Sequence, residues 1–430
     1  MTSSTTGKLT AARKPASPFR IIAAACVGNA LEWYDIAIYS FFAVYIARVF
    51  FPTQDPALSL ILALGTFAVS FLIRPLGALV LGSYADRAGR KPALTLSLGL
   101  MVVGTLLICI MPSYAAIGVL APIGILVARL VQGFAAGGEF GSATAMMVEH
   151  LPGRRGFAAS WQFTSQAMAS LLAASIGTLL TTTLSPEQIE SWAFRIPFLF
   201  GLLVGPAGIF IRRHVPETPE AEARLKSNIP NTPVRTIMRK QKMLVLLTIG
   251  LLAVTTCLNY MITYIPTYAI QTLKLPDSSG FIATLVGGLV LLLVTPFAGH
   301  FSDKVGQLRI MIPAAGLILV LIYPMFAVMV TFPTLGVLLL VVFFMALFKA
   351  CYYGPMGAAM AAVFPAETRA TGMAVGYNIG VTIFGGFTPL IATVLINSTG
   401  NDMAPSFWVI FAALVSMVSM IVVWKRLGLR

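Results

Sequence analysis

Charged side chains are scarce in this sequence. Asp, Glu, Lys and Arg make up 10% of its 430 residues, while hydrophobic residues make up 58%. A water-soluble core cannot bury that much apolar surface, so lipid must surround most of the chain. The apolar residues form long blocks without strand-like alternation. This pattern favours helices over a β-barrel, because each helix satisfies its own backbone hydrogen bonds in lipid. We therefore expect an all-α membrane protein.

Cysteine and histidine are also rare, with four and three residues. The cysteines lie inside apolar segments without paired spacing, which is typical of small core residues rather than disulfides or metal ligands. The histidines sit at separate segment ends. The sequence lacks a nucleotide-binding loop and a Ser/His/Asp set, so we expect no metal centre, no cofactor and no enzymatic activity. Residues 1–20 are polar and basic and lack the apolar core of a removable signal peptide.

Twelve apolar segments are long enough to span a membrane as helices. They cover residues 21–47, 57–82, 93–112, 116–147, 158–183, 193–213, 243–270, 279–302, 308–330, 334–363, 371–396 and 404–424.

Basic residues outnumber acidic ones, 29 to 15, but they are unevenly placed along these segments. On one side of the membrane lie 23 of the 29, on the other side three, and the last three (Arg74, Arg129 and Lys349) lie inside segments. By the positive-inside rule, both termini are cytoplasmic. The net charge of +14 therefore reflects topology and does not indicate a nucleic-acid partner.

The longest polar interval divides the helices into six and six. We expect a cytoplasmic N-terminal tail, a first bundle, a cytoplasmic linker, a second bundle and a cytoplasmic C-terminal tail, at residues 1–20, 21–213, 214–242, 243–424 and 425–430.

The two halves repeat a pattern. GSYADRAGRKP (82–92) follows the second helix and GHFSDKVGQLR (299–309) follows the eighth. Asp86 thus aligns with Asp303 at an offset of 217 residues. Repeats of this kind are typical of transporters with two parallel six-helix halves, whose substrate site lies between them near the midplane.

These segments resemble a known family. The loop after the second helix, with its degraded copy after the eighth, is similar to the signature of the major facilitator superfamily. GNALEWYD (28–35), ARLVQGFAAGGEFG (128–141), FRIPF (194–198) and IFGGFTP (383–389) resemble its metabolite–proton symporter branch. The resemblance implies a major facilitator fold in a bacterial inner membrane, working as a monomer by alternating access. Members of this branch import organic acids such as citrate, tricarballylate, 2-oxoglutarate or shikimate, or osmolytes such as proline and betaine, with protons.

The resemblance also implies a latch at the cytoplasmic seam that holds the outward-open state. The alternative is that its basic residues only anchor the topology. The expected latch residues are Gly82, Asp86, Arg87, Gly89, Arg90, Asp303 and Gly306.

Ionisable residues at membrane depth are functional candidates, because a charge there costs about 2.5–3.5 kcal/mol. In the first helix, Asn29, Glu32 and Asp35 recur every three residues and are expected to share one face. An acid beside Arg129 of the fourth helix would make a proton switch, which is ionised while paired and protonated when substrate engages the arginine. Asp35 is favoured over Glu32 as the proton carrier; a static ion pair is the alternative.

Two further charges lie near the cytoplasmic side. Arg74, just before Pro75, either lines the inward-facing cavity and binds substrate or extends to the membrane surface. Glu139 lies among glycines that indicate close helix packing, and is either a second proton-coupling site or a partner for Arg74.

Lys349 is the one charge in the tenth-helix stretch FFMALFKACYYGPMG. It must face the bundle interior, with Tyr352 and Tyr353 on the same face. No acid of the second half lies at its depth, so the sequence predicts that it binds an anionic substrate together with Arg129. The alternative is a pair with an acid of the first helix across the two halves. At this position the chain departs from the citrate-type pattern of the branch, which disfavours citrate but keeps an organic anion.

Uncharged polar residues complete the expected site. Tyr260, Tyr264 and Tyr268 form one stripe on the seventh helix beside Asn259, and either bind ligand or pack in the core. Gln162, Gln166 and Asn378 either line the cavity or join helices to one another.

The sequence as a whole predicts a proton-coupled importer of a small organic acid anion, with di- or tricarboxylates favoured. Two alternatives remain open within the same fold: a proton–osmolyte symporter for proline or betaine, and a drug exporter.

Overall fold

The computed structural model describes residues 18–88, 90–138, 144, 147–148, 151, 153–202, 239–365 and 368–428. Within these ranges every regular element is a helix. The helices of the first half are α1 (Pro18–Phe41), α2 (Ala43–Phe50), α3 (Pro56–Leu72), α4 (Arg74–Ala88), α5 (Arg90–Ile110), α6 (Tyr114–Ile117), α7 (Leu120–Ala135), η1 (Ala136–Gly138), α9 (Arg155–Thr183), α10 (Pro186–Gln188) and η2 (Ile189–Ala193).

The second half consists of long helices with few interruptions. They are α14 (Lys242–Gln271), α15 (Asp277–Val305), α16 (Gln307–Thr331), α17 (Leu335–Val363), α18 (Arg369–Val381), η3 (Thr382–Gly386), α19 (Thr388–Thr399) and α20 (Pro405–Leu427). The π-helical turn η3 joins α18 to α19, so that Thr371–Thr399 counts as one span.

Most expected spans are visible as helices. By length and composition, eight described helices can cross a membrane, and the α1–α2 pair, bent by 67°, makes a ninth. Two shorter apolar helices, Thr95–Ile110 and Leu120–Ala135, correspond to the third and fourth expected spans. The sixth expected span, 193–213, is described only as far as residue 202, and most of the expected linker, 214–242, lies outside the described residues.

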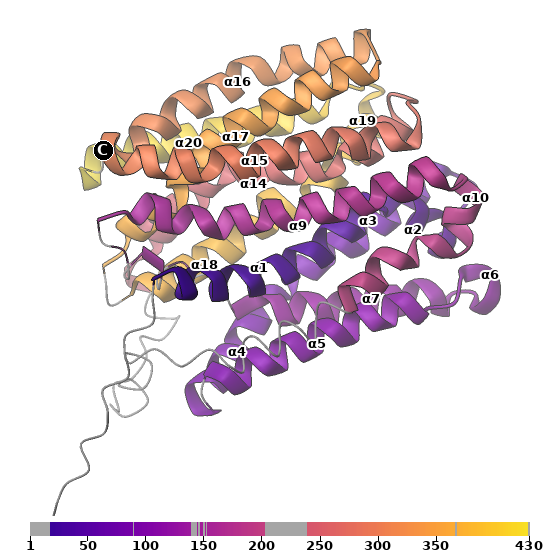
Figure 1. Ribbon diagram of the computed structural model, residues 1–430, viewed down its shortest axis with the longest axis horizontal. Coiled ribbons are helices and arrows are strands. Elements are labelled where there is room, and N and C mark those ends of the chain that lie inside the picture. Colours follow the sequence, from indigo (N-terminus) through magenta and orange to yellow (C-terminus); the bar gives the residue numbers. More distant parts are fainter. Residues whose placement is uncertain are drawn as a thin grey trace, which may run out of the picture.

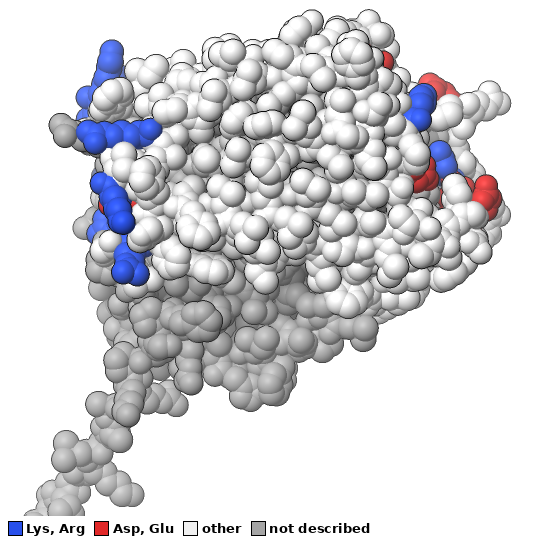
Figure 2. Space-filling model, turned by 45° about the horizontal axis from the view of Figure 1, so that its top comes forward, with Lys and Arg blue, Asp and Glu red and all other residues white. Residues whose placement is uncertain are grey.

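The long helices lie side by side with their axes roughly aligned (Figure 1). Their outer surfaces carry large apolar side chains such as Leu293, Phe297 and Val320, as expected of a surface that faces lipid. On the face that Figure 2 shows, the described charged residues gather at the two ends, with an uncharged belt between them. We call one end the basic end; it carries Arg154, Lys304, Arg309 and Lys425. The opposite end carries Arg48, Glu190, Asp277 and Asp402.

Small residues allow α9 of the first half to approach α15 of the second. A Cβ atom added at Gly299 would lie 2.7 Å from the carbonyl oxygen of Gly156. A Cβ atom at Gly354 of α17 would lie 2.7 Å from the carbonyl oxygen of Thr295. These distances are too short for any side chain, so glycine is required where the backbones meet, as is common between membrane helices.

Side chains also join the two halves at both ends. At the basic end, the Asp303 carboxylate accepts hydrogen bonds from the backbone N–H groups of Gly156 (2.6 Å) and Phe157 (3.0 Å). An acid at the first turn of a helix satisfies unpaired N–H groups and complements the helix dipole. At the opposite end, the Tyr45 hydroxyl donates to Asp277 at 2.5 Å. The halves therefore touch on both sides of the membrane-embedded centre.

The Asp303 contact predicts the effect of Asp303→Asn on the basic end. The variant loses charge-assisted hydrogen bonds worth about 1.5–3 kcal/mol each, so the first turn of α9 opens more often. Hydrogen–deuterium exchange at Gly156 and Phe157 should become about tenfold faster or more. The matched variant Asp277→Asn removes the contact at the opposite end and should leave exchange at these two amides unchanged. Equal exchange in wild type and Asp303→Asn would contradict the assignment.

Candidate functional site

The interior between the two halves holds ionic side chains that are almost completely buried. Arg74 and Arg129 are each 2% exposed, Lys349 is 1% exposed and Asp35 is 6% exposed. Glu32 is close to Arg74 and is also largely buried. Buried charges at this depth are stable only where protein groups replace water around them.

Arg129 of α7 is held by neutral groups and aromatic rings. Its Nη1 donates to Gln132 Oε1 at 2.7 Å and its Nη2 donates to Ser70 Oγ at 3.2 Å. The guanidinium carbon lies 4.4 Å from the ring centre of Tyr39 and 5.1 Å from that of Phe67, which are cation–π distances.

Asp35 of α1 does not pair directly with Arg129. Its Oδ2 accepts a hydrogen bond from Thr105 Oγ1 at 2.5 Å, and Thr105 Oγ1 accepts from Gln132 Nε2 at 3.0 Å. The direct pair expected from the sequence is therefore wrong for this structure, because two uncharged side chains stand between acid and base.

Arg74 has a carboxylate partner. Its Nη2 lies 3.5 Å from Glu32 Oε1, and its guanidinium carbon lies 4.2 Å above the Phe71 ring. With 2% exposure it does not extend to the membrane surface, so that alternative is wrong. Glu139, the other partner considered for Arg74, lies outside the described residues.

The shared face expected for the first helix is also wrong. Asn29 donates to the Gln162 carbonyl oxygen at 2.8 Å and to Ser165 Oγ at 2.7 Å, both in α9. Glu32 faces Arg74 in α4, and Asp35 faces Thr105 in α5. A spacing of three falls 60° short of a full helical turn at each step, so three successive residues reach three different neighbours.

Lys349 of α17 is surrounded by polar but uncharged groups. Its Nζ donates to Asn259 Oδ1 of α14 and lies 4.7 Å from the ring centre of Tyr353. It forms no ion pair with any residue that the structure describes, so the alternative pairing with Asp35 or Glu32 is not realised. Among the residues that the structure describes, the site therefore contains one cation more than it has acids.

The two tyrosines after Lys349 behave differently. Tyr353 donates across the two halves to Gln166 Oε1 at 3.0 Å and stacks on Phe163 with ring centres 4.1 Å apart. Tyr352 donates to the backbone oxygen of Leu251 at 2.7 Å. Its hydroxyl therefore joins α17 to α14 and does not face Lys349. The expectation that both tyrosines flank the lysine is wrong for Tyr352.

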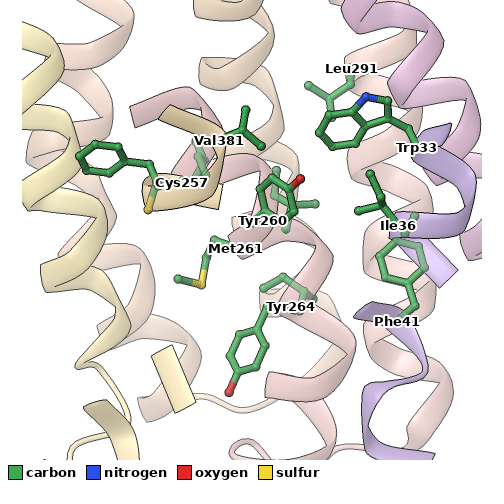
Figure 3. Close-up of a cluster of buried hydrophobic side chains, with 14 of the residues drawn as sticks. Trp33, Ile36, Phe41, Cys257, Tyr260, Met261, Tyr264, Leu291 and Val381 are labelled. Atoms are coloured by element: carbon green, nitrogen blue, oxygen red, sulfur yellow. The ribbon is translucent and has the colours of Figure 1, made fainter. Parts of the chain in front are cut away.

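The three tyrosines of the α14 stripe also differ in the partners of their hydroxyl groups. Tyr264 bonds Thr393 of α19 at 2.8 Å and Tyr268 donates to the backbone oxygen of Asp402 at 2.8 Å. The buried Tyr260 hydroxyl has no hydrogen-bond partner among the described residues. Tyr260 faces Trp33 of α1, with ring centres 5.9 Å apart (Figure 3). Of the three, only Tyr260 keeps a free hydroxyl between the halves.

The amide side chains mostly join helices. Gln162 donates to Asn29 Oδ1 at 3.0 Å, and Asn378 donates to the backbone oxygen of Gly137 at 2.9 Å, across the halves. Two of their polar atoms, Gln162 Oε1 and Gln166 Nε2, lack partners in the described part of the chain.

The expected latch is visible only in part. Gly89 is not described, and the structure does not describe the side-chain surroundings of Gly82, Asp86, Arg87 and Arg90. Asp303 joins the two halves as described above. Gly306 adopts φ 107° between α15 and α16, a conformation that favours glycine.

Several residues that contact the charged groups were not singled out from the sequence, among them Gln132, Thr105 and Gly201. Gln132 stands in the quoted ARLVQG segment and could have been found there, whereas Thr105 is one hydroxyl in an apolar helix and gives no signal. Gly201 lies against Asp35, since a Cβ atom there would be 2.8 Å from Asp35 Oδ1. Among the residues described, no three His, Cys, Asp or Glu side chains gather as metal ligands would.

Comparison with known proteins agrees with this arrangement. The Major Facilitator Superfamily model matches residues 25–327 and again 276–428. Among solved structures, the proton:xylose symporter XylE with bound 6-bromo-6-deoxy-D-glucose superposes with a TM-score of 0.77 at 17% identity, over 95% of both chains. XylE from E. coli in a partially occluded inward-open conformation superposes with a TM-score of 0.74 at 17% identity, over 96% of this chain and 98% of that chain. The all-helical fold expected from the sequence is confirmed.

Two curated relatives are more similar in sequence. The citrate-proton symporter of Klebsiella pneumoniae is 36% identical over 401 residues, 93% of this chain and 90% of the relative. The proline/betaine transporter of Escherichia coli K12 is 32% identical over 412 residues, which are 93% of this chain and 82% of the relative. The chain belongs to the major facilitator superfamily, and within it to the metabolite–proton symporter family that includes these two kinds of transporter. It is a multi-pass membrane transporter and not an enzyme.

The Glu32–Arg74 pair predicts a stability effect that a double-mutant cycle can isolate. Glu32→Gln leaves a buried guanidinium without its carboxylate and should destabilise the protein by about 3 kcal/mol, whereas Glu32→Gln with Arg74→Met should recover most of this loss. Thermal unfolding of the purified protein in one detergent measures the stability of wild type, of Glu32→Gln and Arg74→Met alone, and of the double variant. An additive double mutant would show that the two side chains do not interact.

Proposed function

We propose that this chain imports a small organic acid anion together with protons, by alternating access across a bacterial inner membrane. The basic end would face the cytoplasm, with both termini there, in keeping with the positive-inside rule. We propose further that the carrier works as a monomer and that di- or tricarboxylates are its substrate class. The observation that carries the proposal is the excess buried cation.

The charge balance of the interior supports an anionic substrate. Among the described residues, the interior holds three buried cations and two acids, which leaves one positive charge. The cations are Arg74, Arg129 and Lys349, and the acids are Glu32 and Asp35. A buried charge without a partner is unfavourable unless a ligand supplies the opposite charge. If Asp35 takes up a proton, a second cation loses its counter-charge, and the site then suits a ligand with two carboxylates.

Donors for such a ligand are available at the centre. The Nε atoms of Arg74 and Arg129 and the Tyr260 hydroxyl have no partners within the described ranges. Both arginines lie within electrostatic range of the Tyr260 hydroxyl. Arginine and tyrosine donors suit carboxylate oxygens, and Lys349 would contribute from the second half. A ligand held by both halves would couple binding to their relative movement.

The aromatic rings argue against an osmolyte with a quaternary ammonium group. Such a ligand needs uncovered ring faces or an unpaired acid. The rings of Phe71, Tyr39, Phe67 and Tyr353 are each covered by an arginine or lysine of the protein itself. Glu32 is already paired with Arg74, and Asp35 already accepts a hydrogen bond from Thr105. The proline/betaine alternative, suggested by the 32% identical relatives, is therefore less well supported than the organic anion.

The proposal predicts that Lys349→Met weakens binding of the transported anion about 10- to 100-fold, because a charge-assisted hydrogen bond of about 1.5–3 kcal/mol is lost. The substrate is first identified by thermal shift with citrate, tricarballylate, 2-oxoglutarate, shikimate and betaine. Citrate is included because of its named transporters among the relatives, although the sequence pattern at Lys349 disfavours it. The KM of uptake into proteoliposomes then measures the effect.

A control and a second test variant accompany Lys349→Met. Lys304→Met removes an exposed lysine at the basic end and should leave the KM of uptake unchanged. Arg129→Lys keeps the charge but loses the planar donor set, and should weaken uptake. An unchanged KM in Lys349→Met, or a protein stabilised by betaine but by none of the acids, would refute an organic-anion site at this lysine.

A further inference from the structure

Thr105 of α5 stands between the proton-binding acid and the arginine. Its hydroxyl oxygen lies 2.5 Å from Asp35 Oδ2, 3.0 Å from Gln132 Nε2 and 3.1 Å from the backbone oxygen of Met101. A hydroxyl donates one hydrogen bond and accepts two. Thr105 therefore has two acceptors for its single proton, and only one of them can be used at a time.

The hydrogen bonds between Arg129 and Asp35 all run in one direction. Arg129 donates to Gln132 at 2.7 Å, Gln132 donates to Thr105, and Thr105 donates to the carboxylate of Asp35. Hydrogen bonds in such a chain polarise and strengthen one another. This direction requires that Asp35 Oδ2 carries no proton, because a protonated Oδ2 becomes a donor itself.

We propose that Thr105 and Gln132 are positioning residues that transmit the protonation state of Asp35 to Arg129. This inference rests on the proposed function. A proton that arrives on Asp35 Oδ2 turns this oxygen into a donor to Thr105 Oγ1. The Thr105 proton then turns to the Met101 carbonyl oxygen, and no proton is gained or lost by the threonine.

The consequence reaches Arg129 through the amide of Gln132. Thr105 Oγ1 now accepts from both Asp35 and Gln132, so the Gln132 hydrogen bond weakens. The Gln132 side chain is then less firmly held, and Arg129 Nη1 becomes available to a substrate carboxylate. Proton binding at Asp35 thus prepares the arginine for the anion without an ion pair between the two.

The surroundings of Asp35 leave few other routes for this coupling. The titratable or charged groups that act on it from the neighbouring described elements are Arg129 of α7, Cys109 of α5 and Tyr34 of its own helix. The helix after η2 offers Gly201, which has no side chain. Asp35 Oδ1 has no hydrogen-bond partner among the described residues. Within the described ranges, Thr105 is thus the side chain that hydrogen-bonds the Asp35 carboxylate and can respond directly to the proton.

Infrared difference spectroscopy tests this arrangement without any substrate. The carbonyl stretch of protonated Asp35 is identified by its loss in Asp35→Asn. In Thr105→Val the band should shift to higher frequency, because the carboxyl O–H loses its acceptor. In Gln132→Leu it should shift to lower frequency, because Asp35 no longer shares Thr105 Oγ1 with the amide. Thr105→Ser should restore the wild-type position.

A matched control is Thr284→Val in α15. Thr284 is also buried, and its hydroxyl donates only within its own helix, to Gly280 at 2.8 Å. In Thr284→Val, the carbonyl band of Asp35 should lie at the same frequency as in wild type. If the Asp35 band is unmoved in Thr105→Val or in Gln132→Leu, the relay is overturned.

Transport by the same variants separates this inference from the proposed function. With radiolabelled citrate and tricarballylate as probes, Thr105→Val should lose accumulation driven by a pH gradient at least tenfold. Counterflow, which needs no net proton movement, should fall much less than this accumulation does. Equal loss of both would indicate a merely structural threonine and overturn the relay. If wild type accumulates neither acid, citrate and tricarballylate are not its substrates, while the infrared bands still decide the relay.

Discussion

A charge inside a membrane protein must find replacements for the water that it has lost, and this constraint organises the centre of the molecule. The structure meets it in three different ways. Arg74 has a carboxylate partner, Glu32. Arg129 is held by an amide, a hydroxyl and two aromatic rings. Lys349 has an amide oxygen and one ring but no acid among the described residues.

These solutions differ in how easily a ligand can replace them. An ion pair resists replacement, because removing one partner leaves the other buried and uncompensated. An uncharged amide or ring can be exchanged for a carboxylate with a gain in electrostatic energy. The cations held by neutral groups, Arg129 in the first half and Lys349 in the second, are therefore the ones best prepared to bind an anion. Arg74 is less easily separated from its partner Glu32 and is therefore better suited to stabilise the structure of the site.

Much of the fold followed from the sequence alone. Long apolar blocks define helices because backbone groups in lipid must be satisfied locally, and the distribution of Lys and Arg separates the two ends. The repeated GSYADRAGRK-like segment correctly placed Asp303 where the halves meet, although its role as a latch remains a prediction. Local physical rules of this kind need no knowledge of which helices become neighbours.

The site was only partly predictable, because its details depend on those neighbours. Helical spacing placed Asn29, Glu32 and Asp35 near one another but could not show that each contacts a different helix. Likewise Tyr352 and Tyr353 are adjacent in sequence, yet one supports α14 and the other reaches across to Gln166. Thr105 gave no signal at all, since a single threonine in an apolar helix is ordinary until the acid beside it is known.

The 67° bend between α1 and α2 has a consequence for the first membrane span. The three polar residues Asn29, Glu32 and Asp35 lie on α1, before the bend, whereas Tyr45, which contacts Asp277, lies on α2, after it. A bend at Phe42 means that the two segments need not rotate as one rigid rod. Movement of α2 at the opposite end would therefore leave the contact of Asp35 with Thr105 in place.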